Sequence, residues 1–210
     1  MTKARRDRSL SQHPMTYADL MTPTRRRDKA ATRAALLDAA RLRFARHGYD
    51  GTGVREIAAD AGVDPALVFR YFGSKKELYA QAVRPEIPEG LADGTDRSAA
   101  VLADTLLHEV VLADWDEYGG EHPLLVMLRS SGRAEVREQL RAQLCDGYLR
   151  QFAERLPGTS PELRAEMLGA LLLGLGVMRS VVGSPALNAA SPERTRALFA
   201  RVVAPLVEEE

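Results

Sequence analysis

The sequence of 210 residues contains a single cysteine, Cys145, so no disulfide is expected within the chain. It also lacks a long apolar segment. The longest, residues 167–178, has 12 residues, whereas a helix that crosses a bilayer needs about 20. The basic N-terminus is not followed by the apolar stretch of a secretory signal. These absences predict a cytoplasmic protein in a reducing compartment.

Patterns typical of enzymes and metal sites are missing as well. His108-Glu109 is not followed by a second His at the spacing of a zinc-protease helix, and no Walker, dinucleotide-binding or G-x-S-x-G pattern occurs. His108, His122 and Cys145 lack the spacing of metal ligands and are interpreted as structural. We therefore expect no enzymatic activity, no metal and no cofactor.

Charge is balanced overall but unevenly distributed. Residues 1–80 hold 16 Lys and Arg against 9 Asp and Glu, and residues 81–210 hold 13 against 20, so the halves carry +7 and −7. Most of the basic excess lies in residues 1–27, in clusters at residues 5–8 and 25–27. A basic N-terminal part is typical of proteins that contact phosphate groups. The alternative is a solvated tail without specific contacts.

The stretch from Thr52 to Lys75 predicts two short helices joined by a tight turn. Helical spacing puts Val54, Ile57, Ala58 and Ala61 on one face of the first helix. Gly62 suits the left-handed backbone that ends a helix. Asp64 can then cap a second helix, in which Pro65 occupies the first position.

The second helix of this pair buries Val68 and Phe72, which leaves its other faces for a partner. Two helices joined by a Gly-containing turn form a helix-turn-helix, whose second helix can enter the major groove of DNA. The residues left facing outward are Pro65, Ala66, Leu67, Phe69, Arg70 and Tyr71.

The segment from Leu36 into the helix after Ser74 resembles the tetracycline-repressor (TetR) family of bacterial regulators. The matching features are LLDAA, F and GY in a first helix, T-x-V-R-x-I-A in the second, A-G-V in the turn, and F-R-Y-F-x-S-K-x-x-L beyond it. The resemblance implies an all-α fold of about nine helices. In that fold a three-helix DNA-binding domain precedes a helical ligand-binding and dimerisation domain.

We accordingly predict three parts. They are a disordered basic arm (residues 1–27), a DNA-binding domain (residues 28–83, motif about 53–72) and an effector-binding and dimerisation domain (residues 84–210). A first helix is expected over residues 28–47, with a buried stripe at Leu37, Ala40 and Phe44. The arm is expected either to follow the DNA backbone or to make no specific contact.

Several DNA contacts follow from the resemblance. Gly53 stands where the family usually has a Ser or Thr cap, and Phe69 stands where it commonly has Tyr. Arg55 is expected to reach a guanine or a phosphate, and Ala66 or Leu67 a thymine methyl group. The expected DNA-binding set is Thr52, Gly53, Arg55, Asp64, Pro65, Ala66, Leu67, Phe69, Arg70, Tyr71 and Lys75.

The apolar residues of the C-terminal half follow helical spacing and show no strand-like alternation. Helices are expected near residues 98–113, 124–131, 134–156, 161–181 and 192–204. The helix from Pro161 is apolar on two sides, so one side is expected to meet a second subunit. The expected dimer interface comprises Leu168, Leu172, Leu175, Gly176, Leu198 and Val202.

An apolar effector pocket is implied by the resemblance. Aromatic and Met side chains suit such a site, although the same residues serve as ordinary core in most proteins. The expected lining is Trp115, Tyr118, Met127, Tyr148, Met167 and Met178.

These features together predict a cytoplasmic, nucleoid-associated repressor. It would bind a palindromic operator of double-stranded DNA as a homodimer, and a small apolar effector would release it. Two alternatives remain open. One is a ligand-independent DNA-binding protein whose C-terminal half only dimerises, and the other is a small-molecule-binding or enzymatic helical protein with a vestigial helix-turn-helix.

Overall fold

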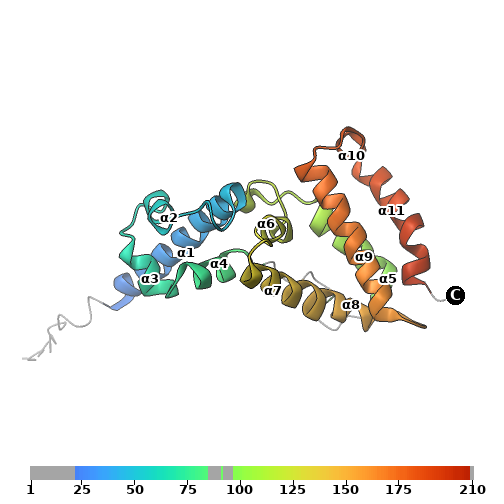
Figure 1. Cartoon of the computed structure of the whole chain (residues 1–210), viewed down its shortest axis with the longest axis horizontal. Coiled ribbons are helices and arrows are strands. Elements are labelled where there is room, and N and C mark those ends of the chain that lie inside the picture. Colours follow the sequence, from blue (N-terminus) through green and yellow to red (C-terminus); the bar gives the residue numbers. More distant parts are fainter. Residues whose placement is uncertain (1–21, 85–90, 92–96, 209–210) are drawn as a thin grey trace, which may run out of the picture.

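The computed structural model describes residues 22–84, 91 and 97–208, and all regular structure in these residues is helical. The molecule is elongated, with the first four helices at one end and the last three at the other (Figure 1). This confirms the all-α fold expected from the sequence. Within the described part of the chain, no helix is both long and apolar enough to span a membrane.

Four helices form the N-terminal end: α1 (Thr22–His47), α2 (Val54–Asp60), α3 (Ala66–Phe72) and α4 (Lys75–Ala82). Their shared hydrophobic core, the first core, is built on Leu36, Ala40, Phe44, Ile57, Ala58, Val68, Phe72, Leu78 and Tyr79. Leu36 is buried, whereas the predicted Leu37 is only partly so. The stripe is therefore displaced by one residue from the prediction at its first position.

The backbone of α1 begins at Thr22, six residues before the predicted start, so the prediction of disorder through residue 27 is wrong for residues 22–27. The second basic cluster, residues 25–27, lies within this helix. The first cluster, residues 5–8, lies outside the described residues, as does most of the predicted linker between residues 84 and 97.

The C-terminal half contains further helices, several of which continue into π-helical turns. In chain order they are α5 (Ala99–Leu107) with η1 (His108–Leu112), η2 (Asp116–Tyr118), α6 (Pro123–Arg129), α7 (Ala134–Gln143) with η3 (Leu144–Leu149) and α8 (Arg150–Ala153), α9 (Pro161–Gly176) with η4 (Val177–Val181), α10 (Pro185–Ala189) and α11 (Pro192–Val207). The predicted helices are all present. The helix α10, the 3₁₀ turn η2 and the π-helical turns were not predicted from the sequence.

A second core lies among α5, α8, α9 and α11 and includes Leu102, Leu107, Phe152, Leu168 and Phe199. The side chains of Tyr118, Val126, Met127 and Val136 instead join the first core, although they follow residue 84 in sequence. The end of the molecule that carries the helix-turn-helix is thus completed by α6 and the start of α7. The domain boundary at residue 84 stays a proposal.

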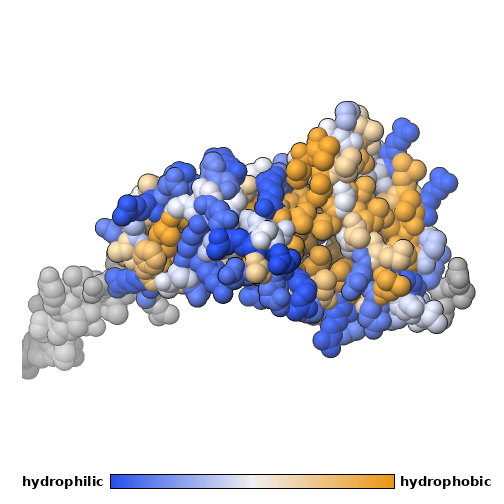
Figure 2. Space-filling model, viewed as in Figure 1, coloured by the Kyte–Doolittle hydropathy of each residue, from blue (hydrophilic) through white to orange (hydrophobic). Residues whose placement is uncertain are grey.

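The two apolar sides of α9 are assigned by burial. Leu168 has no exposed surface, and Leu172 and Gly176 are also buried inside their own chain. These three cannot be offered to a second subunit, so their predicted place in a dimer interface is wrong. The opposite side of α9 is the exposed one, with Leu163 59% and Met167 52% accessible. Figure 2 shows apolar side chains gathered over α9 to α11.

Candidate nucleic-acid interface

The turn between α2 and α3 has the geometry that its sequence predicts. Gly62 adopts a φ of +67°, a conformation that glycine takes without steric penalty. The Asp64 Oδ1 atom accepts a hydrogen bond from the Ala66 backbone N–H at 2.7 Å. Asp64 therefore satisfies an otherwise unpaired donor at the start of α3.

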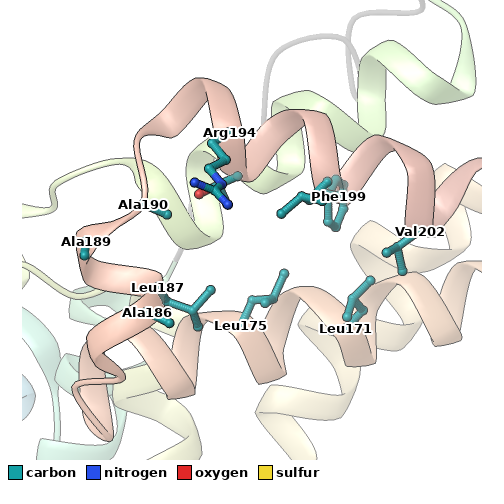
Figure 3. Close-up of a pocket in the computed structure, with 11 residues that line it drawn as sticks. Leu171, Leu175, Ala186, Leu187, Ala189, Ala190, Arg194, Phe199 and Val202 are labelled. Atoms are coloured by element: carbon teal, nitrogen blue, oxygen red, sulfur yellow. The ribbon is translucent and has the colours of Figure 1, made fainter.

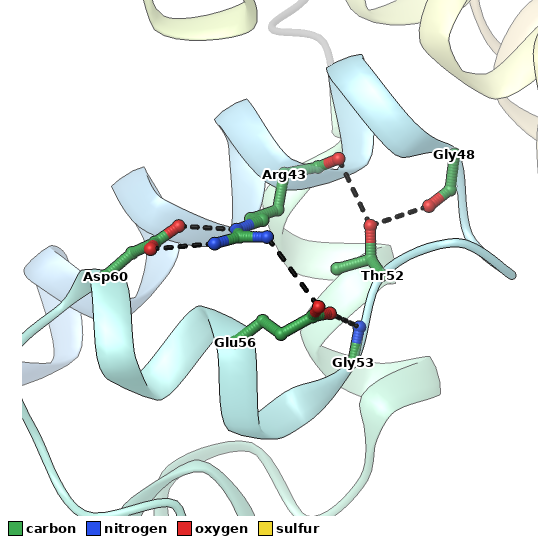
Figure 4. A network of polar contacts seen from close by, with 6 residues as sticks. All are labelled: Arg43, Gly48, Thr52, Gly53, Glu56 and Asp60. Atoms are coloured by element: carbon green, nitrogen blue, oxygen red, sulfur yellow. Dashed lines mark hydrogen bonds and ion pairs between the residues drawn. The ribbon is translucent and has the colours of Figure 1, made fainter.

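The start of α2 is capped by its own third residue. The Gly53 N–H donates to Glu56 Oε2 at 2.7 Å, which replaces the missing hydroxyl cap by one half of a capping box. Arg43 on α1 donates to both carboxylate oxygens of Asp60 at 2.5 and 2.9 Å and lies 3.9 Å from Glu56 (Figure 4). The hydrogen bond from Arg43 lowers the pKa of Asp60. One guanidinium thus fixes both ends of α2 against α1.

Thr52 does not face a partner. Its side chain is only 1% exposed, and its hydroxyl donates toward the carbonyl oxygens of Gly48 at 2.8 Å and Arg43 at 3.1 Å (Figure 4). The prediction that Thr52 contacts DNA is therefore wrong for its side chain. The hydroxyl instead holds the loop between α1 and α2.

The outward face of α3 follows from which residues the core takes. Val68 and Phe72 are buried, and Leu67 packs partly against the first core. Ala66, Phe69 and Arg70 are exposed, and Tyr71 and Pro65 are half-buried. Phe69 is 55% exposed. Leu67 and Tyr71 pack partly against the first core, and the other residues predicted to face a partner from α3 remain accessible.

Two arginines on this face are not paired with an acidic side chain among the described residues. Arg55 at the start of α2 and Arg70 on α3 are exposed, and neither forms an ion pair with any described residue. Two other arginines at this end are paired, Arg43 with Asp60 and Arg133 with Asp50. Exposed, unpaired guanidinium groups suit contacts with phosphates or guanine edges.

Lys75, at the start of α4, is held by an aromatic ring. Its ammonium group lies 4.3 Å from the ring centre of Tyr49, and Arg133 lies over the same ring at 4.9 Å. Burial lowers the pKa of Lys75, an effect that Asp50 opposes. The contact orders a side chain that would otherwise move freely. Its predicted contact with DNA stays a prediction.

The predicted pocket residues do not converge on one cavity. The Trp115 indole N–H donates to the Glu109 carbonyl at 2.9 Å, and the Tyr118 hydroxyl donates to the Ala82 carbonyl at 2.8 Å. Met127 belongs to the first core. Met167 and Met178 are exposed on the outer side of α9 and η4. The prediction that these five residues line one effector pocket is therefore wrong. Among the six predicted residues, only Tyr148 lines an internal cavity.

That internal cavity lies in the C-terminal half and encloses about 30 Å³, close to the room needed for one water molecule. Two π-helical segments, η1 and η3, contribute to its wall, and π-helical turns recur at functional sites. The complete lining is Leu106, Val110, His122, Leu124, Leu144, Tyr148, Leu149, Gly169, Leu172 and Leu173.

His122, which was interpreted as a structural residue from the sequence, is a polar residue in the lining of this cavity. Its Nδ1 atom accepts from the Leu124 N–H at 3.2 Å, so it caps α6. Burial lowers the pKa of His122 to about 4, so the imidazole is neutral at pH 7 and carries its proton on Nε2. The HisPro dipeptide, typical of a helix start, was the only signal of this role in the sequence.

A larger groove of about 500 Å³ lies between α9, α10 and α11 (Figure 3). Leucine side chains of α9 and Phe199 of α11 face each other across it, and Arg194 lies near one end. Leu175, Leu198 and Val202, all three predicted interface residues, line this groove. Their predicted role in dimerisation stays a prediction.

The fold and the recognition face define a helical protein that presents a helix-turn-helix to DNA. Two family models match the chain: "Bacterial regulatory proteins, tetR family" over residues 36–82 and "Tetracyclin repressor-like, C-terminal domain" over residues 100–207. The chain belongs to the TetR family of transcriptional regulators and is a DNA-binding regulator.

Individual relatives agree with this assignment. The chain is 27% identical over 168 residues to the HTH-type transcriptional regulator BetI of Burkholderia ambifaria, covering 73% of this chain and 84% of the relative. It is 39% identical over 61 residues to the HTH-type transcriptional repressor SCO4008 of Streptomyces coelicolor, which is 29% of this chain and 32% of that protein.

Solved structures share the fold. The TetR-family regulator SCO0857 of Streptomyces coelicolor aligns with a TM-score of 0.53 at 27% identity, over 86% of this chain and 96% of that chain. NalD, the secondary repressor of the MexAB-OprM multidrug efflux pump in Pseudomonas aeruginosa, aligns with a TM-score of 0.63 at 22% identity, over 87% and 100%.

Proposed function

We propose that the protein is a cytoplasmic, ligand-responsive repressor that binds a palindromic operator as a homodimer. A small apolar effector bound in the C-terminal half releases it from DNA. The observation that carries the proposal is the position of α6, whose residues contribute to the first core and to the wall of the internal cavity.

Dimerisation is supported by the exposed apolar face of the last helices. Seven large apolar side chains are accessible there: Leu163, Met167, Met178, Val181, Val182, Leu198 and Val202. Exposed apolar patches of this kind mark sites of protein association. A second subunit that covered these side chains would stabilise the dimer by removing them from water. A two-fold dimer presents two recognition helices, as a palindromic site requires.

Effector sensing is supported by the contacts of α6. Leu124, near its start, lines the internal cavity, whereas Val126 and Met127, two and three residues further on, belong to the first core. At its end, Arg129 donates to the Ala45 carbonyl at 2.9 Å, and the Tyr49 N–H donates to Ser130 Oγ at 3.0 Å. A ligand that enlarges the cavity therefore pushes on a helix attached to the end of α1.

The release step follows from this attachment. Moving α6 moves α1 through the Arg129 and Ser130 hydrogen bonds, and α1 carries α2 through Arg43. The recognition helices of the two subunits then no longer match the spacing of successive major grooves. Binding of the ligand weakens binding of DNA, and binding of DNA weakens binding of the ligand by the same factor. The coupling free energy is about 1–3 kcal/mol.

The small volume of the internal cavity favours the second candidate, a ligand-independent DNA-binding protein. Ligand pockets usually measure about 300 Å³ or more, whereas this cavity encloses about 30 Å³. An effector must displace lining side chains to enter. The two candidates differ in whether any compound changes operator binding.

The test begins with an operator selected from random DNA duplexes and binding measured by fluorescence anisotropy at two salt concentrations. Light scattering on the same samples gives the oligomeric state. Compounds are then screened for release of the operator. We expect a dimer, binding that weakens with salt, and release by at least one small apolar compound.

Two matched variants locate the effector site. Leu173→Phe fills the internal cavity, and Leu187→Phe fills the groove between α9, α10 and α11. We expect Leu173→Phe to bind the operator but to lose its release by the compound, with Leu187→Phe retaining it. The reverse pattern contradicts the cavity assignment, and operator binding that no compound changes supports the ligand-independent candidate.

A further inference from the structure

The first residue of α4, Lys75, follows the end of α3 at Phe72 by three positions. Ser74 Oγ accepts the Glu77 N–H at 3.1 Å, which caps α4 and fixes the backbone at its start. From there the Lys75 side chain reaches the Tyr49 ring, with its ammonium group 4.3 Å from the ring centre. A lysine close to the end of the recognition helix is therefore held in place within the protein itself.

The ring of Tyr49 is fixed in turn by its neighbours. It stacks with the ring of Phe44 at 6.1 Å between centres, and it meets the ring of Tyr79 edge-on at 5.1 Å. Phe44 and Tyr79 are both buried in the first core. The Tyr49 backbone N–H donates to Ser130 Oγ at 3.0 Å, and the Arg133 guanidinium lies 4.9 Å from the ring centre. The first core and the ends of α6 and α7 thus hold one ring between them.

The positive charge of Lys75 stays available for a partner. The acidic residue next to Tyr49 is Asp50, and its carboxylate accepts from Arg133 at 2.6 Å. Lys75 forms no ion pair with any described residue. An ammonium group has three N–H donors, and a ring face takes up only one side of it. The other side can therefore still bind an oxygen atom of a phosphate group.

A lysine side chain that moves freely loses rotamer entropy when it binds a partner. Contact with a fixed aromatic ring removes part of that loss in advance. We propose that Tyr49 is a positioning residue, which holds the Lys75 ammonium group ready for a backbone phosphate of the operator. The inference rests on the proposed function, because it presumes an operator. It adds a residue outside the predicted DNA-binding set and connects that contact with α6 and α7 through Ser130 and Arg133.

The test is a double-mutant cycle on the full chain with the selected operator. Tyr49→Leu removes the ring and should weaken operator binding roughly tenfold, or about threefold for each subunit of a dimer, as for the loss of one cation–π contact at each. In the Lys75→Gln background the same substitution should weaken binding no further, because the ammonium group is already absent. Fluorescence anisotropy gives the dissociation constants of all four proteins.

Two matched variants separate positioning from damage to the fold. Tyr49→Phe keeps the ring and should bind the operator as the wild type does. Lys76 is the adjacent, exposed lysine and contacts no aromatic ring among the described residues. In the Lys76→Gln background, Tyr49→Leu should therefore keep its full effect. Thermal melting of each variant sets an assay temperature at which all of them are folded.

The dependence of binding on salt provides a second readout. Tyr49→Leu leaves the lysine charge in place, so the slope of binding against salt should match that of the wild type although binding is weaker. Lys75→Gln removes the charge and should flatten the slope. A general loss of structure in the loop after α1 would not produce this separation.

The possible failures are distinguishable. Wild-type affinity in Tyr49→Leu, an equal loss in Tyr49→Phe, or an undiminished effect of Tyr49→Leu in the Lys75→Gln background would overturn the positioning role while leaving DNA binding intact. A wild-type protein that binds no duplex at either salt concentration would overturn the proposed function itself.

Discussion

The two ends of the molecule are held together differently. At the N-terminal end, polar contacts join helices that the first core already packs: Arg43 binds Asp60, Thr52 holds two carbonyls, and Tyr118 donates to Ala82. At the C-terminal end, the helices meet mainly through the aliphatic side chains of the second core. Directional hydrogen bonds fix orientation, whereas aliphatic contacts tolerate rearrangement.

The difference corresponds to what each end does. Reading DNA requires a fixed recognition surface, and the pinned helices α1 to α4 provide one. The other end holds the internal cavity and three π-helical turns, and such turns recur at functional sites.

Substitutions on the two sides of α9 should differ most in their effect on the free energy of unfolding. Leu168→Ala removes a fully buried side chain and should lower the free energy of unfolding by about 2–5 kcal/mol. Leu163→Ala, on the exposed side of the same helix, should change the stability of the isolated subunit by less than about 0.5 kcal/mol. Urea denaturation at low protein concentration measures both. Equal losses would contradict the assignment of the two faces.

The buried His122 should make stability depend on pH. The pKa of His122 is about 4 in the folded protein, against an ordinary value of 6.5. Between pH 4 and pH 6.5 the unfolded chain therefore binds a proton at His122 that the folded chain does not bind. Its contribution is complete above pH 6.5 and is lost as pH falls toward 4, by about 3 kcal/mol in total.

Urea denaturation across this pH range provides the measurement, and two variants provide the control. His122→Asn keeps a side-chain cap for α6 but does not titrate there, so its pH dependence should be flatter. His108→Asn changes an exposed histidine and should leave the wild-type dependence in place. Identical curves for all three proteins would rule out His122 as the source.

The connection between the two ends should weaken when Ser130 is changed. Ser130→Ala removes the oxygen that accepts the Tyr49 N–H and should lower stability by about 1 kcal/mol. It should also reduce release of the operator by an effector. Ser131→Ala, whose hydroxyl bonds only within its own turn to Leu128, is the control. A Ser130→Ala protein with unchanged stability and unchanged release would show that this bond carries no coupling.

The smallest effect is expected from a single phosphate contact. Lys75→Gln should weaken operator binding several-fold and flatten the dependence of binding on salt by about one ion per subunit. Anisotropy titrations at a series of salt concentrations give that slope. Lys76→Gln changes the adjacent, more exposed lysine and should affect the slope less. A slope that Lys75→Gln leaves unchanged would place this ammonium group away from phosphate.

The local features of the helix-turn-helix could be predicted from the amino-acid sequence alone. Gly62, Asp64 and Pro65 specify a turn through backbone conformation and capping, which depend on neighbouring residues only. Helical spacing likewise put Val68 and Phe72 inward and left Phe69 and Arg70 outside. The order of the main helices followed from the same short-range rules.

Which apolar surfaces meet could be established only from the folded structure. On α9 both sides are apolar, so periodicity could not tell Leu168 from Met167, and the packing of α5 and α8 settled it. In the same way, α6 joined the first core, and Thr52 turned its hydroxyl inward to two carbonyls. The physical reason is that hydrophobic burial is non-directional: a pattern shows that a face must be covered, and long-range packing decides by what.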